Sequence, residues 1–185
     1  MQFLRLQNSS LGHALSSAPQ MLTLIAAGNL SVLVLALVAQ HLMGMQPCAW
    51  CIVQRIDVLM LLLVSLSGAT LARVLPRAAP ALSGLMLMAL SGGGLWAAWH
   101  QHTVAAKQLS CAFTWADRTL MTLSLDAWWP AVFEVRATCA DAAQAVVFGL
   151  PFELWSAGWF AMVMMASFRV LLLGLQSRSR LPVSS

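Results

Sequence analysis

Long apolar runs alternate with polar segments along this chain, and these runs give the first structural prediction. A helix needs roughly 20 consecutive apolar residues to cross the hydrocarbon core of a bilayer. Backbone groups in lipid must be hydrogen-bonded within their own segment, so runs of this length are expected to be helical. Four segments meet this requirement, at residues 21–43, 50–71, 81–99 and 152–173. The pattern predicts an all-α membrane protein, a four-transmembrane-helix bundle formed by one integral membrane domain over residues 1–185.

The polar segments between the runs differ greatly in length. Residues 73–80 form a short turn whose two prolines, Pro76 and Pro80, are expected to stop the adjoining helices. Residues 100–151 are too long for a simple connection, and loops of this size are usually functional or disordered. The middle of this loop is apolar, so part of it is expected to lie on the membrane surface with Trp128 and Trp129 at headgroup level.

Composition and charge support a membrane protein and exclude a nucleic-acid partner. The chain is 60% hydrophobic and 9% charged, whereas a soluble domain carries about 25% charged residues. The net charge of +4 is not gathered into a basic patch, because six arginines fall on one side of the predicted bundle and most acids on the other. These arginines are Arg5, Arg73, Arg77, Arg169, Arg178 and Arg180. Basic residues flank membrane helices on the cytoplasmic side, which predicts a multi-pass bacterial inner (cytoplasmic) membrane protein with both termini cytoplasmic.

All four cysteines then lie at or beyond the periplasmic face, where disulfides persist. Cys48 and Cys51 form a Cys-x-x-Cys pair where the second predicted helix begins, directly after Pro47. Their spacing is compatible with a disulfide, and the unsatisfied amides of a helix start favour a negatively charged sulfur. This places a redox-active pair at the rim of the bilayer, within reach of a carrier that lives in lipid.

Arg55 follows Cys51 by four positions and shares one helical stripe with both cysteines of the pair. A guanidinium at the membrane edge is costly without a partner, and a thiolate or an oxygen of a lipid-soluble ligand would serve. Snorkelling to the interface is the simpler alternative. Pairing with Asp57 is disfavoured because residues two apart on a helix do not face each other. We favour a functional Arg55 and leave the role of Asp57 open.

The other two cysteines, Cys111 and Cys139, lie in the long loop. Four cysteines allow three pairings, and the sequence-local pairing of Cys48 with Cys51 and of Cys111 with Cys139 is favoured. A purely structural staple explains the loop pair on spacing alone. A four-cysteine zinc site is the weaker alternative, since such sites usually use two tight Cys-x-x-Cys knuckles. No metal is expected.

With these motifs in place, the chain resembles the disulfide bond formation protein B (DsbB) family. The resemblance covers nearly the whole chain. The motifs that carry it are Pro47-Cys48-x-x-Cys51-x-x-x-Arg55, the two loop cysteines, Leu125-Asp126-x-Trp128-x-Pro130-x-Val132-Phe133, Phe148-Gly149-Leu150-Pro151 and Trp155-Ser156. Gln54 departs from the Glu often found before that arginine.

The resemblance implies a thiol:quinone oxidoreductase that reoxidises a periplasmic DsbA-like thioredoxin-fold protein and passes electrons to ubiquinone or menaquinone in the membrane pool. On this sequence, Cys111 would take the attack of the partner thiolate and Cys139 would be its disulfide partner. Cys139 would pass electrons on through Cys48, and Cys51 would face the quinone.

Arg55 would assist at the quinone, and His100 or His102, after the third predicted helix, could donate a hydrogen bond to a quinone oxygen. Two alternatives stay open at this point. One is a vitamin K epoxide reductase-like membrane thiol oxidoreductase, in which the Cys-x-x-Cys usually comes late in the chain. The other is a non-catalytic membrane protein with a disulfide-stapled loop.

Overall fold

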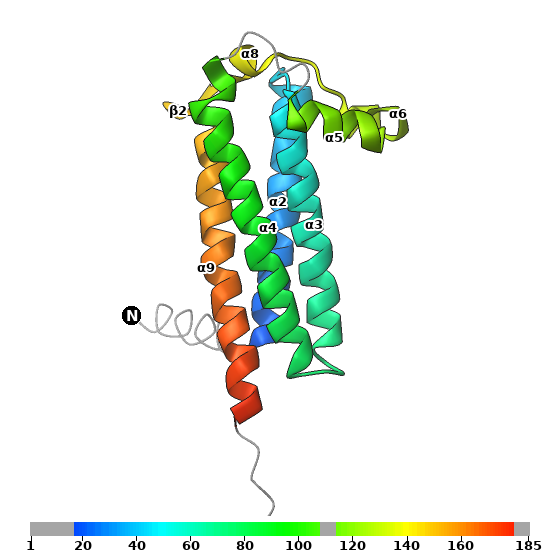
Figure 1. Cartoon of the computed structure of the whole chain (residues 1–185), viewed down its shortest axis with the longest axis vertical. Helices are drawn as coiled ribbons and strands as arrows, with labels where there is room; N and C mark the ends of the chain where they lie inside the picture. Colours follow the sequence, from blue (N-terminus) through cyan, green and yellow to red (C-terminus); the bar gives the residue numbers. More distant parts are fainter. Residues whose placement is uncertain (1–16, 108–113, 180–185) are drawn as a thin grey trace, which may run out of the picture.

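Four long helices form the body of the molecule, and they run side by side (Figure 1). The structure, a computed structural model, describes residues 17–107 and 114–179. All four helices are long and apolar enough to cross a membrane, so the predicted all-α four-transmembrane-helix bundle is confirmed. The helices are α2 (Ala18–Leu42), α3 (Ala49–Leu71), α4 (Ala78–Thr103) and α9 (Phe152–Ser179).

The boundaries of α4 differ from the prediction at both ends. Pro80, expected to stop a helix, lies in the first turn of α4. The first backbone N–H groups of a helix have no partner within it, so a proline there costs no hydrogen bond. At its other end α4 continues to Thr103 rather than 99, and His100 and His102 therefore belong to its last turn instead of following it.

The helices pack unequally, and two glycines set the tightest contact. A Cβ at Gly84 would lie 2.7 Å from the backbone nitrogen of Leu171, and one at Gly174 would lie 2.6 Å from that of Ala81. The backbones of α4 and α9 therefore approach closely near the start of α4 and the end of α9, as small residues allow in membrane bundles. Helix α2 packs along α3, whereas the contact between α2 and α9 is much smaller. The α2–α9 side of the bundle is thus its most open side.

Short elements between α4 and α9 cover one end of the bundle, which we call the cysteine end because Cys48, Cys51 and Cys139 lie there. Helices α5 and α6 project from it to one side, across the direction of the long helices (Figure 1). The predicted loop is thus largely built from short helices, and the membrane-surface position of α5 and α6 stays a prediction. The elements are η1 (Ala105–Lys107), α5 (Trp115–Leu123), α6 (Leu125–Trp128), α7 (Pro130–Phe133), α8 (Cys139–Ala143), and the paired strands β1 (Val146–Val147) and β2 (Leu150–Pro151).

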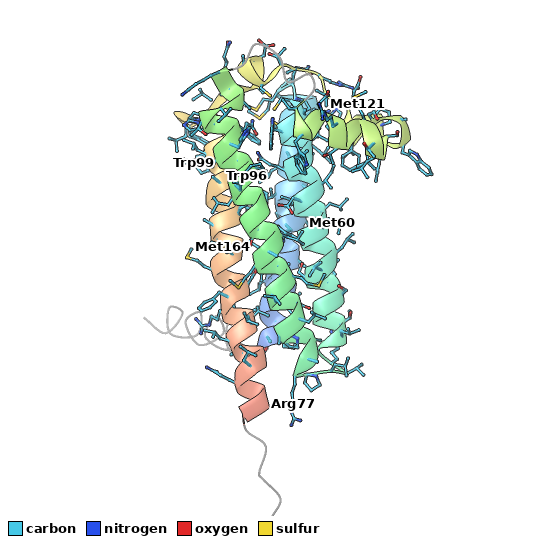
Figure 2. The ribbon with its side chains drawn as sticks, in the orientation of Figure 1. Met60, Arg77, Trp96, Trp99, Met121 and Met164 are labelled. Carbon is cyan, nitrogen blue, oxygen red and sulfur yellow. The ribbon has the colours of Figure 1, made fainter. Side chains whose placement is uncertain are left out.

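Two buried clusters hold the structure together. One fills the centre of the bundle and includes Leu22, Leu61 and Phe160. The other lies at the cysteine end, where residues of α5, α7 and α8 pack onto the starts of α3 and η1 and onto the end of α4. Outside these clusters, large apolar side chains cover the exposed surface of the bundle, and Figure 2 shows Met60, Trp99 and Met164 pointing outward. Such a surface suits lipid as its solvent.

Candidate functional site

The Cys48–Cys51 pair lies where α3 begins. Cys48 is the N-cap residue in extended conformation, and Cys51 lies in the first turn. The two sulfur atoms are 3.1 Å apart, both cysteines are free, and Cys48 is fully buried. A disulfide requires about 2.05 Å, so the pair is a dithiol poised to form that bond with little movement.

Hydrogen bonds to Pro47 hold this helix start in place. Its carbonyl oxygen accepts from the backbone N–H groups of Arg136 and Ala137, at 3.0 and 3.2 Å. This contact brings the chain leading into α8 over the dithiol. Cys139, the first residue of α8, is disulfide-bonded and fully buried in the same cluster as Cys48. The fold therefore brings one loop cysteine to the membrane pair, while Cys111 lies outside the described residues.

Two hydrogen-bond donors converge on the sulfur of Cys51. Gln54 Nε2 donates to Gln101 Oε1 at 2.7 Å, and Gln101 Nε2 donates to Cys51 Sγ at 3.4 Å. The thiol of Cys48 is the second donor, because its hydrogen bond to Cys51 and its burial raise the pKa of Cys48. These effects favour the proton on Cys48 and negative charge on Cys51.

Arg55 is buried one turn further along α3 and connects three parts of the chain. Its guanidinium donates to Gln40 Oε1 in α2 at 2.5 Å and to the carbonyl oxygen of Val132 in α7 at 2.7 Å. Among the described residues it has no ion pair with Asp57, which lies instead against Gly94 of α4. Arg55 therefore has protein partners at the membrane edge and does not snorkel.

A cavity of about 400 Å³ lies beside Cys51 and Arg55. Its polar wall includes Cys51, Gln54, Arg55, Gln101 and Glu153, and most of the rest is formed by residues of α2 and α9. Trp159 also lines the cavity, and its indole N–H donates to Asn29 Oδ1 at 3.0 Å. Leu35 and Met162, on the open α2–α9 side, line the cavity and are also exposed on the bundle surface. The cavity thus borders the surface that faces lipid.

This cavity suits a lipid-soluble quinone. Ligand sites of this size are mostly apolar and carry a few polar groups that orient the ligand. Here the polar groups cluster around the reactive sulfur, and Glu153 Oε2 is buried without a hydrogen-bond partner in the part of the chain that the structure describes. Gln54, Arg55, Gln101 and Glu153 would hold the quinone oxygens, and the α2–α9 side would admit the apolar tail.

The two predicted histidines have different surroundings, and neither belongs to the cavity wall. His100 stacks against Trp50, with ring centroids 4.6 Å apart, and also lies beside Trp96. His102 Nδ1 is 3.1 Å from Oε1 of Glu153, so it contacts a residue that does line the cavity. His102 is therefore connected to the candidate site through Glu153, whereas His100 packs in an aromatic cluster.

Sequence reasoning missed Gln40, Gln101 and Glu153. All three lie within or beside apolar runs, and all are almost fully buried. Polar residues inside predicted membrane helices are expensive in lipid and therefore mark functional sites. That signal was available for Gln40 at the end of the first run and for Glu153 at the start of the fourth.

Comparisons with known proteins agree with this arrangement. The family model described as Disulfide bond formation protein DsbB matches residues 18–170. Disulfide bond formation protein B 2 of Pseudomonas aeruginosa is 31% identical over 140 residues, which cover 74% of this chain and 80% of that protein. Disulfide bond formation protein B of Ralstonia nicotianae is 33% identical over 132 residues, covering 69% and 77%. The protein of the same name from Yersinia enterocolitica is 33% identical over 150 residues, covering 77% and 81%.

Proposed function

The chain belongs to the disulfide bond formation protein B (DsbB) family, and from that premise we propose that it is a thiol:quinone oxidoreductase of the bacterial inner membrane. Its substrate is the dithiol of a periplasmic DsbA-like thioredoxin-fold protein, and its electron acceptor is ubiquinone or menaquinone. One observation carries the proposal: Cys51 lies in the wall of a cavity that borders the lipid-facing surface. A membrane protein with a merely stapled loop has no need of a dithiol there.

Electrons enter at the loop pair. A thiolate of the soluble partner attacks Cys111 and breaks its bond to Cys139, and the partner's second thiol then displaces Cys111 to complete its own disulfide. The Cys139 thiolate next attacks the Cys48–Cys51 disulfide at Cys48 and releases the Cys51 thiolate, and Cys111 displaces Cys48 to restore the loop disulfide. This route is supported by Cys48 and Cys139 sharing one buried cluster. The net result is a reduced Cys48–Cys51 pair and an oxidised partner.

Electrons leave at Cys51. A bound quinone supplies an acceptor for two electrons and two protons, and with it the dithiol returns to the disulfide. Gln101 and Cys48 direct their hydrogens to Cys51 and so stabilise negative charge on that sulfur. A ligand in the cavity would shield the reacting sulfur from bulk water, which would strengthen these hydrogen bonds.

The need for a quinone follows from redox potentials. DsbA, the partner of the system to which this family belongs, is already a strong oxidant at about −120 mV. An ordinary structural disulfide lies below about −300 mV and would not oxidise it. Coupling to a quinone that respiration reoxidises supplies the driving force.

The test is oxidation of a reduced DsbA-type protein by the purified protein with a short-chain ubiquinone or menaquinone. The wild type should oxidise the partner with either or both quinones. Cys111→Ser should abolish partner oxidation, yet its chemically reduced Cys48–Cys51 pair should still reduce quinone, because Cys51 lines the cavity. Cys51→Ser should lose both reactions. Full partner turnover by Cys111→Ser, or quinone reduction by Cys51→Ser, would contradict the proposal.

A further inference from the structure

We propose that Glu153 and His102 form a proton-transfer pair, in which the Glu153 carboxyl group donates a hydrogen bond and then a proton to an oxygen of the bound quinone. His102 returns the proton from the aqueous side. This inference rests on the proposed function and assigns a catalytic residue, Glu153, and a positioning and relay residue, His102.

The position of Glu153 is the first argument. Glu153 lies in the first turn of α9, is 2% exposed and lines the cavity beside Cys51. Its Oε1 faces His102 Nδ1 at 3.1 Å, while its buried Oε2 has no hydrogen-bond partner within residues 17–107 and 114–179. A buried polar atom left without a partner costs about 1–3 kcal/mol. A ligand oxygen in the cavity would complete its hydrogen bonding.

The second argument is the connection to water. The side chain of His102 is 38% exposed, whereas that of Glu153 is 2% exposed. One ring nitrogen of His102 faces the carboxyl group, which leaves the other for solvent. A proton can therefore pass from water to His102, from Nδ1 to Oε1 of Glu153, and from Oε2 into the cavity. A half-turn of the carboxyl group about its Cγ–Cδ bond then exchanges the two oxygens, so the proton received from His102 is presented to the cavity for the next turnover.

The proton balance fits the redox reaction. Oxidation of the Cys48–Cys51 dithiol breaks two S–H bonds, forms one S–S bond, and releases two electrons and two protons. The quinone takes up both electrons and needs two protons on its oxygens. Glu153 delivers one of these protons and regains it from water through His102. The second proton comes from the dithiol, and the other dithiol proton leaves to water, so the carboxyl group is unchanged after each turnover.

No other described residue of the cavity wall can take this role. The remaining titratable groups there are Cys51 and Arg55, both from α3. Cys51 is the sulfur that loses electrons, and Arg55 already donates to Gln40 and Val132. Glu153 is the one carboxyl group among the described residues that line the cavity.

The first experiment measures equilibrium binding of a short-chain ubiquinone to the oxidised protein at one fixed pH. Oxidation prevents turnover, and quenching of the cavity tryptophans reports binding. In Glu153→Gln the affinity should stay within about threefold of the wild type, because the amide still donates a hydrogen bond. Glu153→Ala should bind more weakly, because alanine offers no polar group to the ligand.

The second experiment measures quinone reduction by the pre-reduced protein in a single turnover. Glu153→Gln should be slowed about 100-fold, the low end of the contribution of general acids. Glu153→Ala should be slow and partly restored by added acetic acid, which a structural role would not produce. Glu134→Gln is the matched control, because Glu134 is exposed and pairs with Arg136; it should behave as wild type.

Wild-type rates of quinone reduction in Glu153→Gln would overturn the inference, as would a slow Glu153→Ala variant that acetic acid does not restore. Should Glu153→Gln fold poorly, Glu153→Asp replaces it and should retain both quinone binding and measurable reduction. Failure of the proposed function looks different: the wild type itself would neither bind nor reduce the quinone.

Discussion

At the scale of single residues, the chemistry depends on which groups donate to Cys51. Cys48 and Gln101 both direct a hydrogen toward its sulfur, and Gln54 orients the Gln101 amide by donating to its oxygen. The Cys-x-x-Cys motif supplies the first donor, whereas Gln101 comes from another helix, 50 positions away. An asymmetric dithiol results, with one sulfur turned to α8 and the other to the cavity.

Arg55 gives a prediction at the same scale. In Arg55→Lys, a single ammonium replaces the planar fork that donates to Gln40 and Val132. The KM for a short-chain quinone should rise about tenfold, the equivalent of about 1.4 kcal/mol, because the cavity wall loses its fixed geometry. Thermal unfolding in detergent should change less than in Arg55→Ala, which leaves two buried acceptors without their donor. Arg136→Lys, at an exposed position, is the control. An unaltered KM in Arg55→Lys would show that Arg55 has only a structural role.

At the scale of elements, the α4–α9 contact positions the site. Glu153 and Trp159 reach the cavity from α9, and Gln101 reaches Cys51 from α4. Their placement depends on how closely the two helices pack at Gly84 and Gly174. Small residues at these two positions therefore support the pairing of the two helices whose other ends carry site residues.

The glycines allow a matched test of that packing. Gly174→Ala should destabilise the bundle by about 1–3 kcal/mol, because the new Cβ meets the backbone of Ala81 and the helices must separate. Gly93→Ala, in α4, meets nothing within 4 Å and should be neutral or slightly stabilising through helix propensity. Thermal unfolding followed by circular dichroism in detergent measures both. Equal stability of the two variants would show that α4 and α9 do not depend on this close approach.

At the scale of the whole molecule, the chain separates two environments. The exposed surface of the bundle is apolar, while the polar cavity wall, the dithiol and α8 gather at the cysteine end. Asymmetry in the arginines predicts that this end faces the periplasm. A soluble thiol partner would then meet the loop cysteines from water and a quinone would enter from lipid, so the two substrates do not compete for one entrance.

Thiol labelling tests this orientation. In a background with all four native cysteines replaced by serine, single cysteines are introduced at Phe148 and Val74, which are 93% and 77% exposed at opposite ends of the bundle. A membrane-impermeant maleimide added to spheroplasts should label position 148 at once. It should label position 74 only after permeabilisation, because the α3–α4 turn would face the cytoplasm. The reverse pattern would place the cysteine end in the cytosol, where its disulfides would not persist.

The sequence alone determined the helices and the location of the reactive pair. Apolar runs long enough to span a bilayer have one stable backbone conformation in lipid, so the bundle could be predicted from length and composition. The cysteine spacing and the motifs around it likewise lie within short local stretches. Boundaries were less certain, as Pro80 and the extra turn of α4 show, because a proline in a first turn and a proline beyond a helix look alike in sequence.

Only the tertiary structure decided which polar residues meet. Gln40, Gln101 and Glu153 come from three helices. From the sequence alone, a polar residue in an apolar run gives no sign of whether it faces lipid, a neighbouring helix or a cavity. His100 and His102 illustrate the point. They are two positions apart on α4, yet His100 stacks against Trp50 and His102 contacts Glu153. The rotation of each helix about its axis is set by side-chain packing between helices that are distant in sequence. The rotation of α9 places Glu153 in the cavity wall, and the rotation of α4 places His102 in contact with Glu153.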